Sequence, residues 1–461
     1  MILKVHYLFF LMLSLFCGVA KSQDYQTLPG NVPKSGFEKR IHDAVYAVKL
    51  IDTHEHIMSE KDALASSADF SCLFTNYQLE DLISSGVAPE EIYKIFKNKD
   101  SSPSAKWEVI KTRWPNTRTT AYGRSVLIGA KDLYGINDLN ENTYAALSHK
   151  IATAHQSGYY EDVLKNKAGI DACLIMEYNT TNPRDVKNEG NCNFNRLFVY
   201  DKYCSFFCFD KMNTKMSAYG KKFTSLQEYE SLIDSVFEQD IKKGIQGAKF
   251  GVAYYRTLKF DDVPRETANT VFEKMKASPE IVFSFDEAKP LQDFIFFKLL
   301  TLCNQYKLPV QIHTGLQTGT GNDITNSNPT GLVKAFFKFP AVKFCILHAG
   351  YPYGGEMATL AKTFANVYID MAWSALISPS YTIRYLQEFI ETVPSNKIMA
   401  FGGDSQTVEG AYGASVLARN TVAETLTRMV KSNYLTEQEA LQIIVKILRT
   451  NALTTYNINI N

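Results

Sequence analysis

The chain has 461 residues, of which 45% are hydrophobic and 13% aromatic, so it can bury a large core in one elaborated barrel or in two to three domains. Lysine and arginine number 49 against 48 acidic residues, and no run of like charges occurs. Composition therefore gives no reason to expect a nucleic acid or another polyanion as a partner, and a small-molecule substrate is the expectation. The sequence has no internal repeat and no low-complexity tract.

The N-terminus is typical of an export signal. A lysine and a histidine precede an apolar stretch over residues 7–19, and small residues at positions 20 and 22 suit cleavage after Ser22. The apolar stretch is short for a membrane span, and no later segment reaches the necessary length. We therefore expect a signal peptide over residues 1–22, a periplasmic or secreted mature chain over 23–461, and no membrane attachment after cleavage.

Two histidines one residue apart, His54 and His56, follow the short apolar run 47–51. In an extended strand alternate side chains point to the same face, so both imidazoles can bind one metal ion. Residues 58–165, which come next, carry many helical stretches and no motif of a known group. We expect this segment to be a helical insertion after the first strand.

From residue 170 onward, short apolar strands alternate with helical patterns. Together with the strand before His54 the strands number eight. Near-continuous apolar strands that alternate with helices predict a parallel sheet, and eight of them predict an α/β fold of the (β/α)8 TIM barrel type, capped at its mouth by the insertion. The remaining strands are expected at 170–177, 196–200, 246–254, 308–312, 342–347, 367–371 and 398–401, and helices at 226–243, 287–306, 331–337, 356–364 and 381–391.

A barrel of this kind gathers the C-terminal ends of its strands around one mouth, so strand-end residues far apart in sequence converge. A lone histidine at a strand end is usually a core or surface residue, but the recurrence of such residues favours a shared metal site. Imidazole and carboxylate are ligands of borderline divalent metals; zinc is the first expectation, with manganese, iron and nickel left open. The expected set is His54, His56, Lys249, His313, His348 and Asp404.

Seven cysteines remain once the signal is removed. Cys192, Cys204 and Cys208 cluster in one loop-rich region, where an exported protein could form a disulfide. The lack of paired Cys-x-x-Cys spacings argues against a zinc ribbon.

The strand-end residues resemble the metal-binding pattern of the amidohydrolase superfamily. More narrowly, the chain is similar to the amidohydrolase-related branch, which includes the amidohydrolase-like domain attached to some glutamine-synthetase-like proteins. The resemblance covers residues 47–405 and Asn451-Ala452 in the closing helix. Its motifs are Ile51 to His56, Gly247-Ala248-Lys249, Gln311-Ile312-His313-Thr314-Gly315, Leu347-His348-Ala349 and Gly402-Gly403-Asp404-Ser405.

The resemblance implies a role for most members of the set. His54, His56 and Asp404 would hold a first divalent metal, and Asp404 would act as a catalytic residue by taking the proton from a metal-bound water. His313 and His348 would hold a second metal, or hold one metal and orient the substrate, which makes His348 the other expected catalytic residue.

Lys249 leaves two interpretations open. In binuclear relatives a lysine at this place is carbamylated and bridges two metals, whereas the nearby Arg256 and Tyr255 also allow a free ammonium that binds a substrate carboxylate. Arg256, Tyr255 and Trp373 are the expected substrate-binding residues, suited to an anionic or ring-bearing molecule.

We predict a metal-dependent hydrolase that cleaves a carbon–nitrogen bond of an amide or cyclic amide, or an ester-like bond, in a small molecule through a metal-bound hydroxide. One alternative is a mononuclear metal-dependent lyase, such as a decarboxylase, or a uronate-type isomerase. The other is a non-catalytic barrel that binds a ligand. The sequence leaves open the substrate, the number of metals and the formation of a homo-oligomer.

Overall fold

Eight parallel strands form one sheet in the computed structural model, and their order in the sheet follows the chain from β1 to β8. The structure describes residues 36–66, 68–74, 76–178, 183, 192–217 and 223–460, and the expected export signal over 1–22 lies outside them. The strands are β1 Leu50–Glu55, β2 Ile170–Glu177, β3 Asn193–Val199, β4 Ile245–Phe250, β5 Val310–Ile312, β6 Phe344–Ile346, β7 Val367–Asp370 and β8 Ile398–Met399.

The sheet closes on itself where β1 meets the segment that follows β8. The backbone N–H of Thr53 donates to Phe401 O at 3.3 Å, that of Asp404 to His54 O at 2.8 Å, and that of His56 to Ser405 O at 2.9 Å. Neighbouring strands from β1 to β8 pair in parallel. The prediction of a (β/α)8 TIM barrel is confirmed.

Helices surround the sheet. The helices of the barrel and its C-terminal part are α2 Gly36–Ala47, α10 Asp201–Cys204, α11 Phe209–Ser217, α12 Leu226–Lys242, α13 Arg265–Ala277, α14 Phe285–Gln305, α15 Val333–Lys338, α16 Gly354–Thr363, α17 Ser374–Ile377, α18 Pro379–Thr392, α19 Val408–Lys431, α20 Glu437–Val445 and α21 Asn451–Tyr456. Between β1 and β2 lie α3 Glu60–Leu64, α4 Asn76–Ser84, α5 Pro89–Glu91, α6 Pro103–Ile110, α7 Trp114–Thr117, α8 Ala121–Tyr134 and α9 Tyr144–Ala154.

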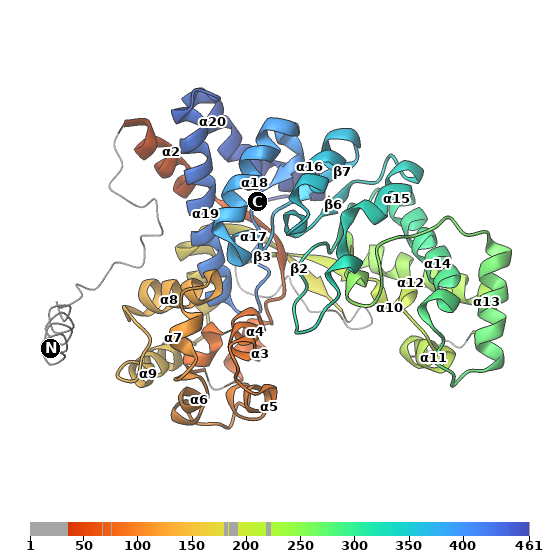
Figure 1. Cartoon of the computed structure of the whole chain (residues 1–461), viewed down its shortest axis with the longest axis horizontal. Coiled ribbons are helices and arrows are strands. Elements are labelled where there is room, and N and C mark those ends of the chain that lie inside the picture. Colours follow the sequence, from red (N-terminus) through yellow and green to blue (C-terminus); the bar gives the residue numbers. More distant parts are fainter. Residues whose placement is uncertain are drawn as a thin grey trace, which may run out of the picture.

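The helices α3–α9 form a separate lobe, called the cap below, with its own apolar core of buried residues that include Phe70, Phe74, Trp107 and Trp114. Figure 1 shows this group of orange and ochre helices gathered beside the lower end of α19. Helix α8 packs along α19. The cap is therefore attached to the barrel next to the loop that leads from β8 into α19.

Apolar side chains fill the barrel interior beneath the strand ends. Ile51, Leu174, Leu197 and Met399 from four strands pack there with Tyr456 of the C-terminal helix α21. Because this interior is packed rather than hollow, only the C-terminal ends of the strands are left to form a cavity.

Some element boundaries differ from the sequence-based expectation. Strand β1 runs to Glu55, so His54 lies inside the strand rather than after it. The strand expected over 246–254 ends at Phe250, and Val252–Tyr254 form a 3₁₀ turn, η5, instead. This turn changes the direction of the chain before Arg256, which matters for the site.

No disulfide forms among the described cysteines, so the bridge considered for Cys192, Cys204 and Cys208 is not made. Cys204 and Cys208 are buried, and the thiol of Cys208 donates to Pro279 O at 3.1 Å. Within the described ranges, no helix combines the length and the apolar character that a membrane span requires.

Candidate metal centre

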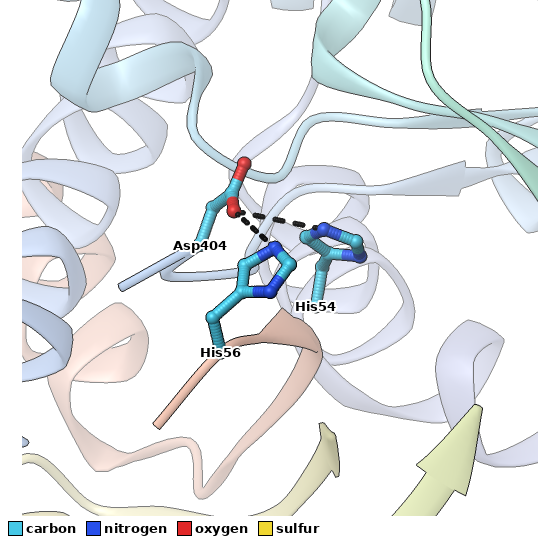
Figure 2. A group of neighbouring side chains, drawn as sticks. All are labelled: His54, His56 and Asp404. Carbon is cyan, nitrogen blue, oxygen red and sulfur yellow. Dashed lines mark ion pairs between the residues drawn. The ribbon is translucent and has the colours of Figure 1, made fainter. Parts of the chain in front are cut away.

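His54, His56 and Asp404 face one another at the barrel mouth, as Figure 2 shows. Asp404 Oδ1 lies 3.6 Å from Nε2 of His54 and 3.2 Å from Nε2 of His56. Potential ligand atoms of all three residues lie within 4.8 Å of one another. Two imidazole nitrogens and one carboxylate oxygen are a donor set that suits a borderline divalent metal. The sequence-based prediction that these three residues converge is met by the structure.

The tautomer of His54 is set by Gln311 in β5. The side-chain amide Nε2 of Gln311 donates to Thr53 O at 2.7 Å and to the Tyr456 hydroxyl at 2.8 Å. The carbonyl Oε1 of Gln311 must then accept from Nδ1 of His54, 2.8 Å away. His54 therefore carries its proton on Nδ1, and its Nε2 presents a lone pair toward Asp404, as a metal ligand would.

Asp404 is buried and remains ionised. Burial would raise the pKa of its carboxyl, but the neighbouring His54 and His56 hold that pKa well below its usual range. Its backbone adopts a φ of 51°, a left-handed conformation that is uncommon outside glycine. Such strain at a buried ionised group is characteristic of functional sites.

His313 and His348 form a second pair of potential ligands. His313 Nε2 lies 2.9 Å from Leu316 O, and His348 Nδ1 lies 3.0 Å from Ala372 O, so each of these nitrogens must carry a proton. The remaining nitrogens, His313 Nδ1 and His348 Nε2, then face each other as lone pairs across 2.9 Å. Burial lowers the pKa of both rings, that of His348 to about 4, so no extra proton bridges them near neutral pH. A cation shared by the two nitrogens would remove this repulsion.

Lys249, at the end of β4, lies in the same cavity and is buried. Burial lowers the pKa of its amine to about 8, although Asp404, Asp201 and Asp370 oppose the change. Roughly a tenth of the amine is then neutral at pH 7, compared with about one part in 2,500 for an ordinary lysine. A neutral amine is the form that carbamylation requires.

Two buried carboxyls, those of Asp52 and Glu55, hold the backbone next to His54 and Asp404. Asp52 accepts from the backbone N–H of His54 at 3.1 Å and of Gly403 at 3.2 Å. Glu55 Oε2 accepts from the backbone N–H of Ser405 at 2.7 Å. Burial raises the pKa of Asp52 to about 7 and that of Glu55 well above its usual range. These side chains hold the segment around Asp404 against β1.

The cavity at this mouth has a volume of about 250 Å³. Sequence reasoning did not find Tyr77, which comes from α4 of the cap and stacks on Trp373 with ring centroids 4.3 Å apart. No motif marks Tyr77, because the fold alone brings the cap over the barrel. The lining residues are His54, His56, Tyr77, Tyr178, Val199, Asp201, Lys249, Gly251, Tyr254, Tyr255, His313, Thr318, Asp404 and Gln406.

The three residues expected to bind substrate have different positions. Tyr255 lines the cavity and is 59% exposed, so it lies at the mouth. Trp373 is buried behind the site, with its ring edge-to-face against His348 at 5.2 Å, and supports that imidazole.

The expectation that Arg256 contacts substrate is corrected by the structure. Its guanidinium is fully buried and pairs with Asp293 of α14 at 2.6 Å. It also donates to Gln292 Oε1 and to two backbone carbonyls. The turn over Val252–Tyr254 directs this side chain toward α14 rather than into the cavity.

Comparison with known proteins gives one family and one curated relative. An amidohydrolase family model matches residues 260–458. The chain is 28% identical to Protein fluG of Emericella nidulans over 201 residues, which are 42% of this chain and 22% of that protein. The chain thus spans about a fifth of the length of this relative.

Solved structures share the fold at low sequence identity. A uronate isomerase from Thermotoga maritima superposes with a TM-score of 0.76 at 15% identity over 91% of this chain and 97% of that one. A glucuronate isomerase from Caulobacter crescentus superposes with a TM-score of 0.77 at 16% identity, over 94% of this chain and 96% of that one. A protein of Lactobacillus casei described as a metal-dependent hydrolase superposes with a TM-score of 0.64 at 18% identity, over 90% of this chain and 97% of that one. Residues 260–458 are thus identified as part of the amidohydrolase family, and the barrel and the His-His-Asp site agree with the resemblance to its amidohydrolase-related branch.

Proposed function

We propose that this protein is a metal-dependent hydrolase that cleaves the carbon–nitrogen bond of an amide or cyclic amide, or an ester-like bond, in a small molecule. The observation that carries the proposal is the position of Asp404. Its Oδ1 faces His54 and His56, and its Oδ2 lies 3.7 Å from Nδ1 of His348. This ionised carboxylate therefore lies beside His54 and His56 and also near the ring of His348, where it approaches the nitrogen that donates to Ala372 O.

The residues of the site would have different roles in this reaction. His54, His56 and Asp404 would hold a divalent ion, which supplies Lewis-acid activation of water and of the scissile carbonyl when bound. Asp404 accepts the proton of the attacking water and returns it to the leaving group. His348, fixed by Ala372 O and packed against Trp373, keeps its Nε2 lone pair directed toward the site. The tyrosines of the cavity restrict access of bulk water.

Lys249 supports the hydrolase over the single-metal alternatives. Its amine is buried among the potential ligands and has a pKa of about 8, which favours carbamylation. A carbamate on Lys249 would supply the bridging oxygens that bring the His54 and His313 halves of the site together, as the resemblance to binuclear relatives implies.

A second cavity of about 450 Å³ continues from the first and shares Tyr178, Val199, Asp201 and Tyr255 with it. Phe206 and Phe207 supply apolar surface there. We propose that the substrate extends from the reacting bond into this cavity and ends in an acidic group, because three lysines line it: Lys202, Lys211 and Lys215.

A uronate-type isomerase is the second candidate. The fold is similar to that of a uronate isomerase over 91% of this chain and to that of a glucuronate isomerase over 94%. These matches are long enough to include most of the cap as well as the barrel, which favours this candidate. This reaction would use one metal and an uncarbamylated Lys249. A mononuclear decarboxylase would have the same metal content, so the products must distinguish the two.

Metal content per chain, measured by elemental mass spectrometry, tests the hydrolase proposal. We expect His54→Ala to lose about two ions relative to the wild type and Lys249→Ala to lose about one, while His42→Ala, which changes a histidine on α2, keeps the wild-type content. A loss of about one ion in His54→Ala with no effect of Lys249→Ala would favour the isomerase or the lyase instead. Equal metal content in the wild type and in His54→Ala would overturn the barrel-mouth metal site.

A substrate panel completes the test. Metal-loaded protein should release an amine from N-acyl amino acids, or open cyclic amides and lactones to amino and hydroxy acids, and should leave hexuronates unchanged. Conversion of hexuronates to keto sugars would support the isomerase instead. Ligand binding without turnover of any member would support the non-catalytic barrel.

We further propose that zinc is the bound ion and that the protein is exported to the periplasm or beyond. The donor set of imidazoles and carboxylate suits zinc, and the sequence of residues 1–22 suits a cleaved signal. Mass spectrometry of the protein from its natural source would find a mature N-terminus at Gln23 if the export proposal is right, and at Met1 if it is wrong.

A further inference from the structure

Outside the barrel mouth, three potential metal ligands from different elements meet at the junction between the cap and the barrel. Cys72 lies in the 3₁₀ turn Phe70–Leu73, His155 directly follows α9, and Glu409 lies in the first turn of α19. Glu409 Oε1 is 2.7 Å from His155 Nε2 and 3.4 Å from Cys72 Sγ. Ligand atoms of all three lie within 4.8 Å of one another.

The oxygen at the centre of this cluster is crowded. Besides Cys72 and His155, the hydroxyls of Tyr134 and Tyr159 approach Glu409 Oε1 at 2.9 and 3.0 Å. Four donors thus share one carboxylate oxygen, which has roughly two lone pairs to offer. The two tyrosine oxygens are also only 2.5 Å apart. So dense a group of electron-rich atoms suits a cation better than a set of hydrogen bonds.

His155 adds a second indication. Its Nδ1 is buried and has no hydrogen-bond partner among the described residues, although its Nε2 bonds Glu409. Hydrogen bonds within the cluster therefore leave one buried nitrogen of the His155 ring unsatisfied, which is costly. The side chains of His155 and Glu409 are 11% and 1% exposed, so solvent does little to satisfy either.

A cavity of about 190 Å³ leads to the cluster and is lined by Cys72, His155 and Glu409. Lys97 and Lys99 lie at its exposed rim. The ammonium of Lys106, also in the lining, pairs with Asp69 at 2.7 Å, which neutralises its charge. Because the rim is not acidic, the site would not attract hard cations such as calcium or magnesium by charge alone.

We propose that Cys72, His155 and Glu409 bind a zinc ion through the thiolate, a ring nitrogen and the carboxylate. Thiolate selects zinc over calcium and magnesium, and the two negative ligands balance the charge of the ion. On binding, the thiol of Cys72 loses its proton to solvent. Tyr134 and Tyr159 donate to the carboxylate and orient it, as outer-shell groups of metal sites do.

This ion would join the cap to the barrel next to the segment that carries Asp404. Only four residues separate Asp404 from Glu409, and Gln406 between them lines both the barrel-mouth cavity and the cap cavity. The hydroxyl of Thr407 also donates to the backbone carbonyl of Cys72 at 3.1 Å. The zinc would therefore fix the segment that carries Asp404, whatever reaction the barrel catalyses.

Cobalt substitution tests the site without reference to activity. The full chain is stripped of metal with a chelator and titrated with Co²⁺, which gives a thiolate-to-cobalt charge-transfer band in the near ultraviolet only when cysteine is a ligand. Among the residues that the structure describes, no cysteine lines the barrel-mouth cavity, so the two sites are distinguishable. We expect the band in the wild type and in His54→Ala, and its loss in Cys72→Ser together with one equivalent of bound cobalt.

Cys192→Ser is the matched control, because Cys192 is another partly buried cysteine and precedes β3 at the opposite end of the strands. It should keep the band. Added Zn²⁺ should abolish the band by replacing cobalt. The proposal is overturned if the wild type binds cobalt without the band, if the band persists in Cys72→Ser, or if zinc fails to displace it.

Discussion

Gln311 offers the sharpest test of how the metal centre is organised, because it contacts His54 but not the cavity. Its amide is fixed by Thr53 O and the Tyr456 hydroxyl, which leaves Oε1 to accept from His54 Nδ1 at 2.8 Å. Gln311→Leu keeps the approximate volume of the side chain and removes this acceptor. The His54 ring is then free to exchange tautomers and to rotate.

The expected loss can be estimated from the role of this hydrogen bond. Partners that orient a metal-ligating histidine are typically worth 10- to 100-fold in metal affinity, or about 1.4 to 2.7 kcal/mol. We expect Gln311→Leu to weaken metal binding within that range. A further destabilisation of about 1–3 kcal/mol should appear in unfolding, because Thr53 O and the Tyr456 hydroxyl lose their buried partner.

Competition with a chromophoric chelator measures the affinity, and denaturant unfolding of the metal-free protein measures the stability. Tyr456→Phe is the control, because it removes one partner of Gln311 but leaves the acceptor for His54 in place. It should lower stability by about 1 kcal/mol and change metal affinity less than Gln311→Leu does. If folded Gln311→Leu binds metal as tightly as the wild type, the tautomer argument is wrong.

Three other changes have defined outcomes. Arg256→Ala should lower the free energy of unfolding by about 1–3 kcal/mol, since it leaves the buried Oδ1 of Asp293 without its partner while Lys289 and the Asp261 N–H still contact Oδ2. Turnover per folded molecule should stay near the wild-type value in a parallel assay. Asp240→Asn should be more stable than the wild type at pH 7 by up to about 3 kcal/mol, because burial raises the pKa of Asp240 from 3.8 to about 6 and the folded wild type loses stability as pH rises through that window. Urea titrations should find that this difference in stability disappears below about pH 4. A difference that does not change with pH would contradict the raised pKa of Asp240. Replacing both Lys211 and Lys215 by alanine should raise KM roughly 2- to 10-fold for substrates with an acidic tail, with kcat and the KM of neutral substrates unchanged in steady-state assays.

The sequence predicted the barrel and the convergence of its ligands because both depend on local patterns. Short apolar runs ending in His54, His313 and His348 indicate buried strands, and parallel strands in a barrel must end at one mouth. The side chain of Asp404 belongs to the same pattern. Their mutual distances then follow from the fold, which the structure provides.

Other features depend on contacts between distant segments, which a single sequence does not reveal. Arg256 comes seven residues after the expected ligand Lys249 and is therefore expected from the sequence to bind substrate, yet its partner Asp293 lies 37 residues later on α14. Tyr77 enters the cavity only because the cap folds back over the mouth. The cluster of Cys72, His155 and Glu409 likewise joins segments 337 and 254 residues apart.

Three residues at successive strand ends share a strained backbone, and the way they are held explains the geometry of the site. His348, Trp373 and Asp404, which follow β6, β7 and β8, have φ values of 65°, 67° and 51°, each at a cost of about 1–3 kcal/mol. Each is fixed by its neighbour around the mouth: the His348 ring bonds Ala372 O, Trp373 N–H donates to Gly402 O, and Asp404 N–H donates to His54 O. Because the last of these bonds also closes the sheet, the orientation of Asp404 depends on barrel closure. The potential metal ligands are therefore positioned by the closed barrel rather than by the loops that carry them.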